Sequence, residues 1–373
     1  MTFKRHLGWL LAAIAGIALA GPETALPDGY TDALRSEFHV GGSYVADAGK
    51  TVMQGQMYVE VLQPRRITRK YPLVFIHGGG QTASNWLKTP DNRMGWAQYF
   101  VAQGYQVYVV DQPARGRSAW HAGINGPLET APVEMVEKYF TATSELGNWP
   151  QARKHTQWPG AGAGKGRRGD PVFDAFFATQ VDYLNDAAAQ PLVQAAGAAL
   201  LDRIGPAILV THSQSGTFGW LIADARRDLV KGIVALEPNG PPVMPARGGK
   251  ARAYGLSDTP LTYAPALAPG EALRFVEQAE AAGAAQLKCW AQAEPARKLT
   301  RLAGLPVLIV TTEASYHASF DHCTHAYLAQ AGVNNDFWRL EQHGIFGNGH
   351  MMMLEKNSLE IAGKLNQWIS KVE

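Results

Sequence analysis

The feature that most constrains the fold is an alternation of short, wholly apolar segments with longer helical ones. Each apolar segment is about five residues long and is bounded by turn residues. A strand that is apolar throughout is buried on both faces, which is typical of a parallel sheet covered by helices on both sides. We therefore predict a mostly parallel, doubly wound α/β sheet. The predicted strands are Pro72–Ile76, Tyr105–Val110, Pro206–Val210, Gly232–Leu236, Pro306–Val310 and Phe337–Glu341.

Other segments complete this pattern. Residues Glu37–Ala46 and Gln56–Leu62 alternate with period two and predict a β-hairpin, while Trp96–Gln103 and Met351–Val372 are predicted helices. Two stretches, 120–194 and 238–303, interrupt the alternation. We expect both to be insertions over the sheet, at least one of them forming a lid.

The N-terminus has the pattern of an export signal. A basic start at Lys4 and Arg5 precedes the apolar run Leu7–Ile17, and Ala18-Leu19-Ala20 is a small-x-small cleavage pattern. We predict a signal peptide over residues 1–20, cleaved before Gly21, and one domain over residues 21–373. The alternative is an uncleaved anchor helix. Cleavage would release the protein into the periplasm or the medium.

The charge balance argues against a nucleic-acid binder and against a polybasic membrane binder. The chain has 34 Lys and Arg and 32 Asp and Glu, and loss of the signal peptide leaves 32 of each. A neutral protein has no overall field that attracts nucleic acid or an anionic membrane. No apolar run of about 18 residues follows the N-terminus, so we expect no membrane span in the mature protein.

Cysteines and histidines give no metal pattern. The two cysteines, Cys289 and Cys323, could form a disulfide in an oxidising compartment or remain as two buried thiols. The histidines near Cys323 match no standard zinc spacing. We therefore predict neither a metal nor an organic cofactor.

A serine motif follows the predicted strand Pro206–Val210. Thr211-His212-Ser213-Gln214-Ser215-Gly216 would turn sharply from that strand into a helix and hold Ser213 exposed at the tip. Such an elbow usually has glycine where this chain has Thr211 and Ser215. The alternative is an ordinary capped helix start.

A glycine turn supports the catalytic interpretation. His77-Gly78-Gly79-Gly80 ends the strand Pro72–Ile76, and glycines let backbone N–H groups turn toward a ligand. We assign the N–H groups of Gly79 and Gln214 to an oxyanion hole, which stabilises negative charge on a carbonyl oxygen under attack.

A nucleophilic serine needs a base and an acid. Only His343 and His350 follow the last predicted strand, and the glycine-rich segment between them lets His350 reach the serine. We predict His350 as the base, at the start of the final helix. Glu237, Glu313 and Asp321 all follow predicted strands, and their positions alone leave the acid open.

These motifs resemble the α/β-hydrolase superfamily, and within it a small branch of exported bacterial esterases. The resemblance covers about Tyr44 to Trp368. It implies an α/β-hydrolase fold and Glu237 as the acid, with Glu313 as the alternative. A member of that branch has two cysteines where this chain has Gly79 and Gly80. The matching segments are Thr89–Trp96, Asp111–Ser118, His212–Gly216, Glu237-Pro238 and Gly349–Met353.

The expected function is therefore a serine carboxylic-ester hydrolase that acts on a small-molecule ester through an acyl-enzyme on Ser213. A lactonase, a polyester hydrolase or an amidase would use the same Ser-His-Glu triad. The alternative from another class is a binding module that has lost catalysis.

Overall fold

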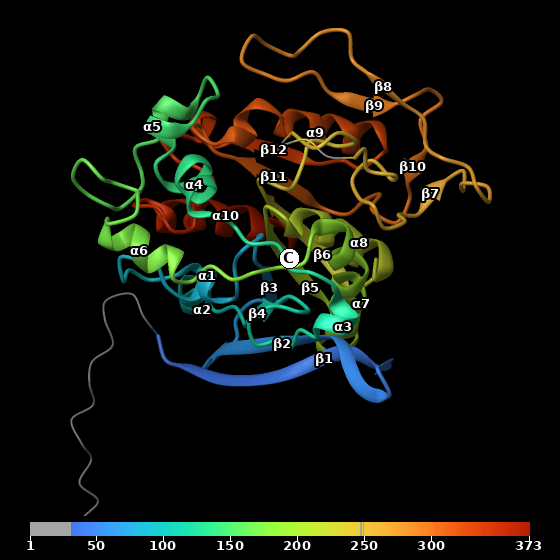
Figure 1. Ribbon diagram of the computed structural model, residues 1–373, viewed down its shortest axis with the longest axis horizontal. Coiled ribbons are helices and arrows are strands. Elements are labelled where there is room, and N and C mark those ends of the chain that lie inside the picture. The colour runs from blue at the N-terminus through green and yellow to red at the C-terminus, as the bar shows by residue number, and fades with distance from the viewer. Residues whose placement is uncertain (1–30, 247, 249) are drawn as a thin grey trace, which may run out of the picture.

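A computed structural model describes residues 31–246, 248 and 250–373, so the predicted signal peptide lies outside the described residues. An eight-stranded sheet, in the order β1-β2-β4-β3-β5-β6-β11-β12, forms the centre of the molecule (Figure 1). Its strands are β1 Ala33–Asp47, β2 Lys50–Pro64, β3 Leu73–Ile76, β4 Val107–Asp111, β5 Ala207–His212, β6 Val230–Leu236, β11 Val307–Thr311 and β12 Asp336–Arg339.

The sheet is mostly parallel. The hairpin of β1 and β2 is antiparallel, as is the pairing of β2 with β4, whereas the remaining strands pair in parallel. Strands β3, β4, β5 and β11 are buried along their whole length, which explains why their sequences are mainly apolar. The predicted strands and hairpin are confirmed, with ends displaced by a few residues.

Helices cover both faces of the sheet (Figure 1). On one face α7 and α8 pack through residues such as Val193 and Phe218, and on the other α2 and α10 pack through residues such as Phe100 and Leu365. The fold is therefore the predicted doubly wound α/β fold. The covering helices are α2 Trp96–Ala102, α7 Asp186–Ile204, α8 Ser215–Ala225, α9 Asp321–Gln330 and α10 Ser358–Val372; α1 is a single turn, Ser84–Leu87.

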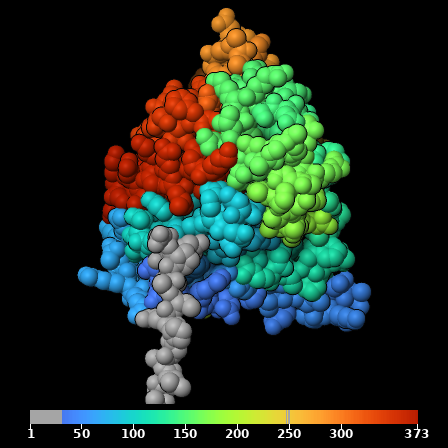
Figure 2. Space-filling model, turned by 90° about the vertical axis from the view of Figure 1, so that its left-hand side faces the viewer, coloured from blue at the N-terminus to red at the C-terminus, as the bar shows by residue number. Residues whose placement is uncertain are grey.

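The two interrupting stretches have different structures. The first ends where α7 begins, at Asp186. It holds short helical segments: α3 Ala122–Asn125, α4 Val133–Val136, the π-helical turn η1 Glu137–Thr141, α5 Thr143–Leu146, the 3₁₀ turn η2 Ala152–Lys154 and α6 Pro171–Phe177. The second holds two small antiparallel sheets, β7 Tyr263–Ala264 with β10 Lys298–Leu299, and β8 Phe275–Glu277 with β9 Trp290–Gln292. Figures 1 and 2 show the β8–β9 segment, in orange, projecting from the body.

A disulfide joins the second stretch to α9. Cys289 and Cys323 are bonded, with their Cα atoms 5.1 Å apart, which decides between the two alternatives left open by the sequence. Within the described ranges, every helix is too short or too polar to cross a bilayer.

The predicted final helix is wrong at its start. Helix α10 begins at Ser358, and residues 351–357 form irregular turns instead. All four side chains of Met351–Leu354 are buried, whereas a helix lying on the sheet buries only one side. His350 therefore lies in a loop and does not open the helix. Strand β12 likewise ends at Arg339 and is followed by the 3₁₀ turn η4 Leu340–His343, while the remaining 3₁₀ turn, η3, spans Tyr316–Ser319.

Candidate active site

Ser213 lies at the sharp turn between β5 and α8. Its φ of 54° is in the left-handed region, which a non-glycine residue adopts only where its surroundings impose it. Ser215 holds this turn, because its Oγ accepts from the His212 N–H at 2.8 Å and donates to the Ile76 carbonyl at 2.7 Å. A glycine at this position could make neither contact. The departure from the usual elbow sequence thus ties the elbow to β3.

Gly216 is the small residue that the turn requires. A Cβ atom at this position would lie 2.4 Å from Pro238 Cβ, closer than real side-chain contacts allow. The first turn of α8 therefore packs directly against the chain that follows β6. The Asn239 N–H also donates to the Ser213 carbonyl at 2.8 Å, which fixes the same junction. This junction brings the ends of β5 and β6 together beside Ser213.

His350 and Glu237 meet beside this elbow. His350 Nδ1 lies 2.6 Å from Glu237 Oε2, and both side chains are buried. The carboxylate also accepts hydrogen bonds from the Thr312 N–H at 2.8 Å, the Thr312 hydroxyl at 2.6 Å and the Ser315 hydroxyl at 2.6 Å. A buried carboxylate is tolerated when its oxygens are hydrogen-bonded in this way. These three donors fix Glu237 against the imidazole.

The alternative acids face other groups. Glu313 Oε1 forms an ion pair with Lys154 Nζ at 2.8 Å, and its second oxygen accepts from the Gly347 N–H at 3.0 Å. Asp321 lies 2.8 Å from His317 Nδ1 and accepts from the Thr311 hydroxyl at 2.6 Å. Of the three candidate carboxylates, the one that the structure places against His350 is Glu237.

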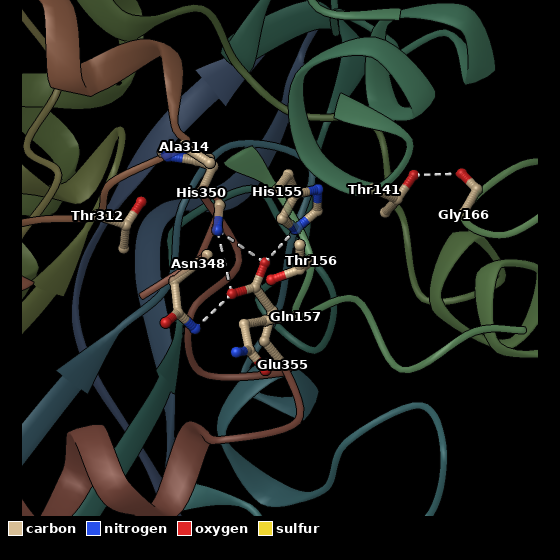
Figure 3. A network of polar contacts seen from close by, with 12 residues as sticks. Thr141, His155, Thr156, Gln157, Gly166, Thr312, Ala314, Asn348, His350 and Glu355 are labelled. Carbon is tan, nitrogen blue, oxygen red and sulfur yellow. Dashed lines mark hydrogen bonds and ion pairs between the residues drawn. The ribbon is translucent and has the colours of Figure 1, made fainter. Parts of the chain in front are cut away.

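The loop that carries His350 is fixed by a buried carboxylate (Figure 3). Glu355 accepts from the Gly349 N–H at 2.9 and 3.1 Å and from Asn348 Nδ2 at 2.7 Å. His155, from the first inserted stretch, places its Nε2 2.6 Å from the same carboxylate. Sequence analysis did not single out His155 or Glu355. A charged residue directly after the apolar run Met351–Leu354 was the one signal available.

Aromatic rings surround the His350 imidazole. The His317 ring stacks on it at 4.9 Å between centroids and 10° between planes, and Phe140 of η1 stacks at 5.1 Å. Tyr316 approaches to 5.1 Å, and the His212 Nε2 lies 3.0 Å from the His350 carbonyl. The imidazole therefore has a fixed position in a wall made mainly of aromatic and imidazole rings. Sequence analysis treated His317 only as part of a histidine cluster without zinc spacing.

A cavity of about 630 Å³ opens onto the elbow. Ser213, Gly79 and Gln214 lie in its wall, together with Phe140 and His317. Among the described residues, neither the Gly79 N–H nor the Gln214 N–H donates to a backbone carbonyl in a turn or loop. Further polar groups line the same cavity: Asn185, Asp186, Asn239 and Arg252. The predicted oxyanion donors and the predicted nucleophile thus share one cavity.

Among the residues that the structure describes, two clusters have the residue types of a metal site. The donor atoms of Glu237, His317 and His350 lie within 4.8 Å of one another. A metal binds imidazole in the plane of the ring, but the rings of His317 and His350 are nearly parallel and stacked, so their lone pairs do not converge. Cys289 and Cys323 lie near His322, but the disulfide leaves no thiolate to bind a metal. Neither cluster has the geometry of a metal centre.

Known proteins match this chain in sequence and in fold. A sequence model described as "Alpha/beta hydrolase family" matches residues 73–363. A "Probable secreted lipase phiG" from Fungal sp. (strain ATCC 74256) is 46% identical over 342 residues, which cover 90% of this chain and 89% of that protein. A solved structure described as that of a novel bacterial esterase is 25% identical and superimposes with a TM-score of 0.65, covering 93% of this chain and 98% of that one.

Proposed function

The chain belongs to the alpha/beta hydrolase family, and from this premise we propose that it is an exported serine hydrolase that cleaves carboxylic esters through a Ser213-His350-Glu237 triad. The similarity to a probable secreted lipase and to a bacterial esterase supports ester hydrolysis and export. The observation that carries the triad is the buried 2.6 Å contact between His350 Nδ1 and Glu237 Oε2 beside the elbow that presents Ser213.

In the proposed mechanism Ser213 Oγ attacks the ester carbonyl carbon. His350 Nε2 takes the serine proton, while Glu237 holds the ring through Nδ1 and stabilises its positive charge. The carbonyl oxygen becomes an oxyanion that accepts from the Gly79 and Gln214 N–H groups. In a comparable site, one such donor stabilises the transition state by about 3 kcal/mol.

Collapse of this intermediate breaks the bond to the alcohol. His350 returns its proton to the leaving alkoxide, and the acyl group remains on Ser213. Water then attacks the acyl-enzyme, with His350 again accepting and returning a proton. The products are a carboxylic acid, an alcohol and the regenerated serine. His350 accepts and returns the proton in each transfer of this cycle.

The test is hydrolysis of p-nitrophenyl esters from acetate to decanoate by wild type, Ser213→Ala and the control Ser370→Ala, which lies exposed on α10. We expect wild type and the control to turn over. Ser213→Ala should remain folded and lose on the order of 10⁶-fold in kcat, as for other serine nucleophiles. An alanine variant with wild-type turnover would contradict the mechanism. A folded wild type inactive on every ester would contradict the ester-hydrolase proposal.

A further inference from the structure

We propose that Arg115 is a positioning residue that fixes both donors of the oxyanion hole. This inference rests on the proposed function. Arg115 follows β4, whereas Gly79 follows β3 and Gln214 follows β5. Its guanidinium lies between these two loops and donates to a group in each. One side chain thus connects the two halves of the predicted hole.

The first contact orients the Gly79 N–H. Arg115 Nη1 donates to the Gly78 carbonyl at 2.9 Å, and His77 Nδ1 lies 2.9 Å from the same oxygen. In a planar trans peptide the carbonyl of one residue and the N–H of the next point in opposite directions. Fixing the Gly78 carbonyl therefore directs the Gly79 N–H to the opposite side of the peptide plane. Because glycines rotate easily, this peptide needs such a restraint.

The bonding of His77 supports this orientation. The Gln112 N–H donates to His77 Nε2 at 3.2 Å, so Nε2 is an acceptor and the ring hydrogen is on Nδ1. Burial, with the nearby charge of Arg115, lowers the pKa of His77 to about 3, which keeps the ring neutral. His77 Nδ1–H and Arg115 Nη1 are then two donors to one carbonyl.

The second contact holds the other donor. Arg115 Nη2 donates to Gln214 Oε1 at 3.1 Å, and Gln214 Nε2 donates to Asp186 Oδ1 at 2.8 Å. The Gln214 side chain is thus held at both ends, which fixes the residue whose N–H is the second predicted donor. Two N–H groups in the planar fork of arginine suit this double contact, whereas lysine offers a single ammonium.

Burying the Arg115 guanidinium costs free energy that no ion pair offsets among the described residues. Its side chain is buried, and across the part of the chain that the structure describes no carboxylate lies within ion-pair distance of it. A buried charge without an ionic partner is destabilising. The nearby Arg117, whose side chain is exposed, forms ion pairs with Glu60 and Asp111 at 2.8 Å each, so it is not a buried charge without a partner. The contacts of Arg115 instead go to groups beside the predicted oxyanion donors.

The test compares Arg115→Lys and Arg115→Met with Arg226→Lys, a control in an exposed ion pair with Asp202. For both Arg115 variants we expect kcat to fall on the order of 10²-fold, as when one oxyanion donor is lost, with KM nearly unchanged. Affinity for a trifluoromethyl ketone, which forms an oxyanion on the serine, should fall by a similar factor. The control should match wild type in all three quantities.

The outcomes separate this inference from the proposed function. Active wild type with unchanged kcat in both Arg115 variants would overturn the role of Arg115 and leave the triad intact. A large rise in KM with unchanged kcat would also overturn it, because Arg115 would then bind substrate directly. Inactive wild type would instead overturn the proposed function. If the Arg115 variants do not fold, Gln214→Met removes the second contact; lower kcat would support the inference, and unchanged kcat would overturn it.

Discussion

At the residue scale, the two strand-end residues at the centre of the site share an unusual backbone conformation. Ser213 has a φ of 54° and Glu237 a φ of 44°, which cost non-glycine residues about 1–2 kcal/mol each. The neighbouring strands impose both conformations: the Ser213 N–H donates to Leu236 and the Glu237 N–H to Val310, at 3.0 and 2.9 Å. The sheet thus stabilises a strained conformation at the ends of adjacent strands.

The identity of the acid is tested by matched substitutions. Glu237→Gln keeps the side-chain size but removes the charge that stabilises a protonated His350, so we expect kcat/KM for the best ester to fall on the order of 10⁴-fold. Glu313→Gln removes an ion pair with Lys154 at the edge of the site and should change kcat/KM less than about tenfold. The reverse order would move the acid to Glu313.

At the element scale, the loop between η4 and α10 depends on Glu355 (Figure 3). Its carboxylate connects Asn348, Gly349 and His155, and it is fully buried. These contacts hold the residues directly before His350. They also explain why the helix begins only at Ser358, because the chain turns back to place Glu355 beneath the loop.

Loss of this carboxylate should affect stability and turnover together. We expect Glu355→Gln to lower the free energy of unfolding by about 2 kcal/mol, because buried N–H groups lose part of their carboxylate acceptor, and to reduce kcat because His350 loses its fixed position. The control Glu360→Gln, exposed in the first turn of α10, should change stability by less than about 1 kcal/mol. Urea unfolding and ester hydrolysis measure both effects. Wild-type stability and kcat in Glu355→Gln would contradict this role.

At the scale of the whole molecule, the elements that could be predicted from the sequence are those that produce a local residue pattern. Buried strands were recognisable because each is a continuous apolar run, and Ser213 because it directly follows one. The contacts that complete the site join distant segments: 200 residues separate His155 from Glu355, and 99 separate Arg115 from Gln214. Such contacts leave no periodic signal in the sequence. For the same reason the sequence left Glu237 and Glu313 as alternatives until the resemblance favoured Glu237.

The first inserted stretch contributes to the site as a whole. It provides Phe140 against the His350 ring, His155 for Glu355 and Lys154 for Glu313. We propose that this stretch and the second one form the cap over a single domain. In this arrangement the sheet positions the reacting groups, and the inserted segments fix their surroundings.

Covalent labelling tests most directly whether Ser213 is the nucleophile. Purified protein would be treated with a fluorophosphonate, and the adduct located by mass spectrometry of peptides. We predict one phosphonyl group on Ser213 of wild type and none in folded Ser213→Ala. An adduct on another residue, or no adduct in a folded and otherwise intact wild type, would contradict the account.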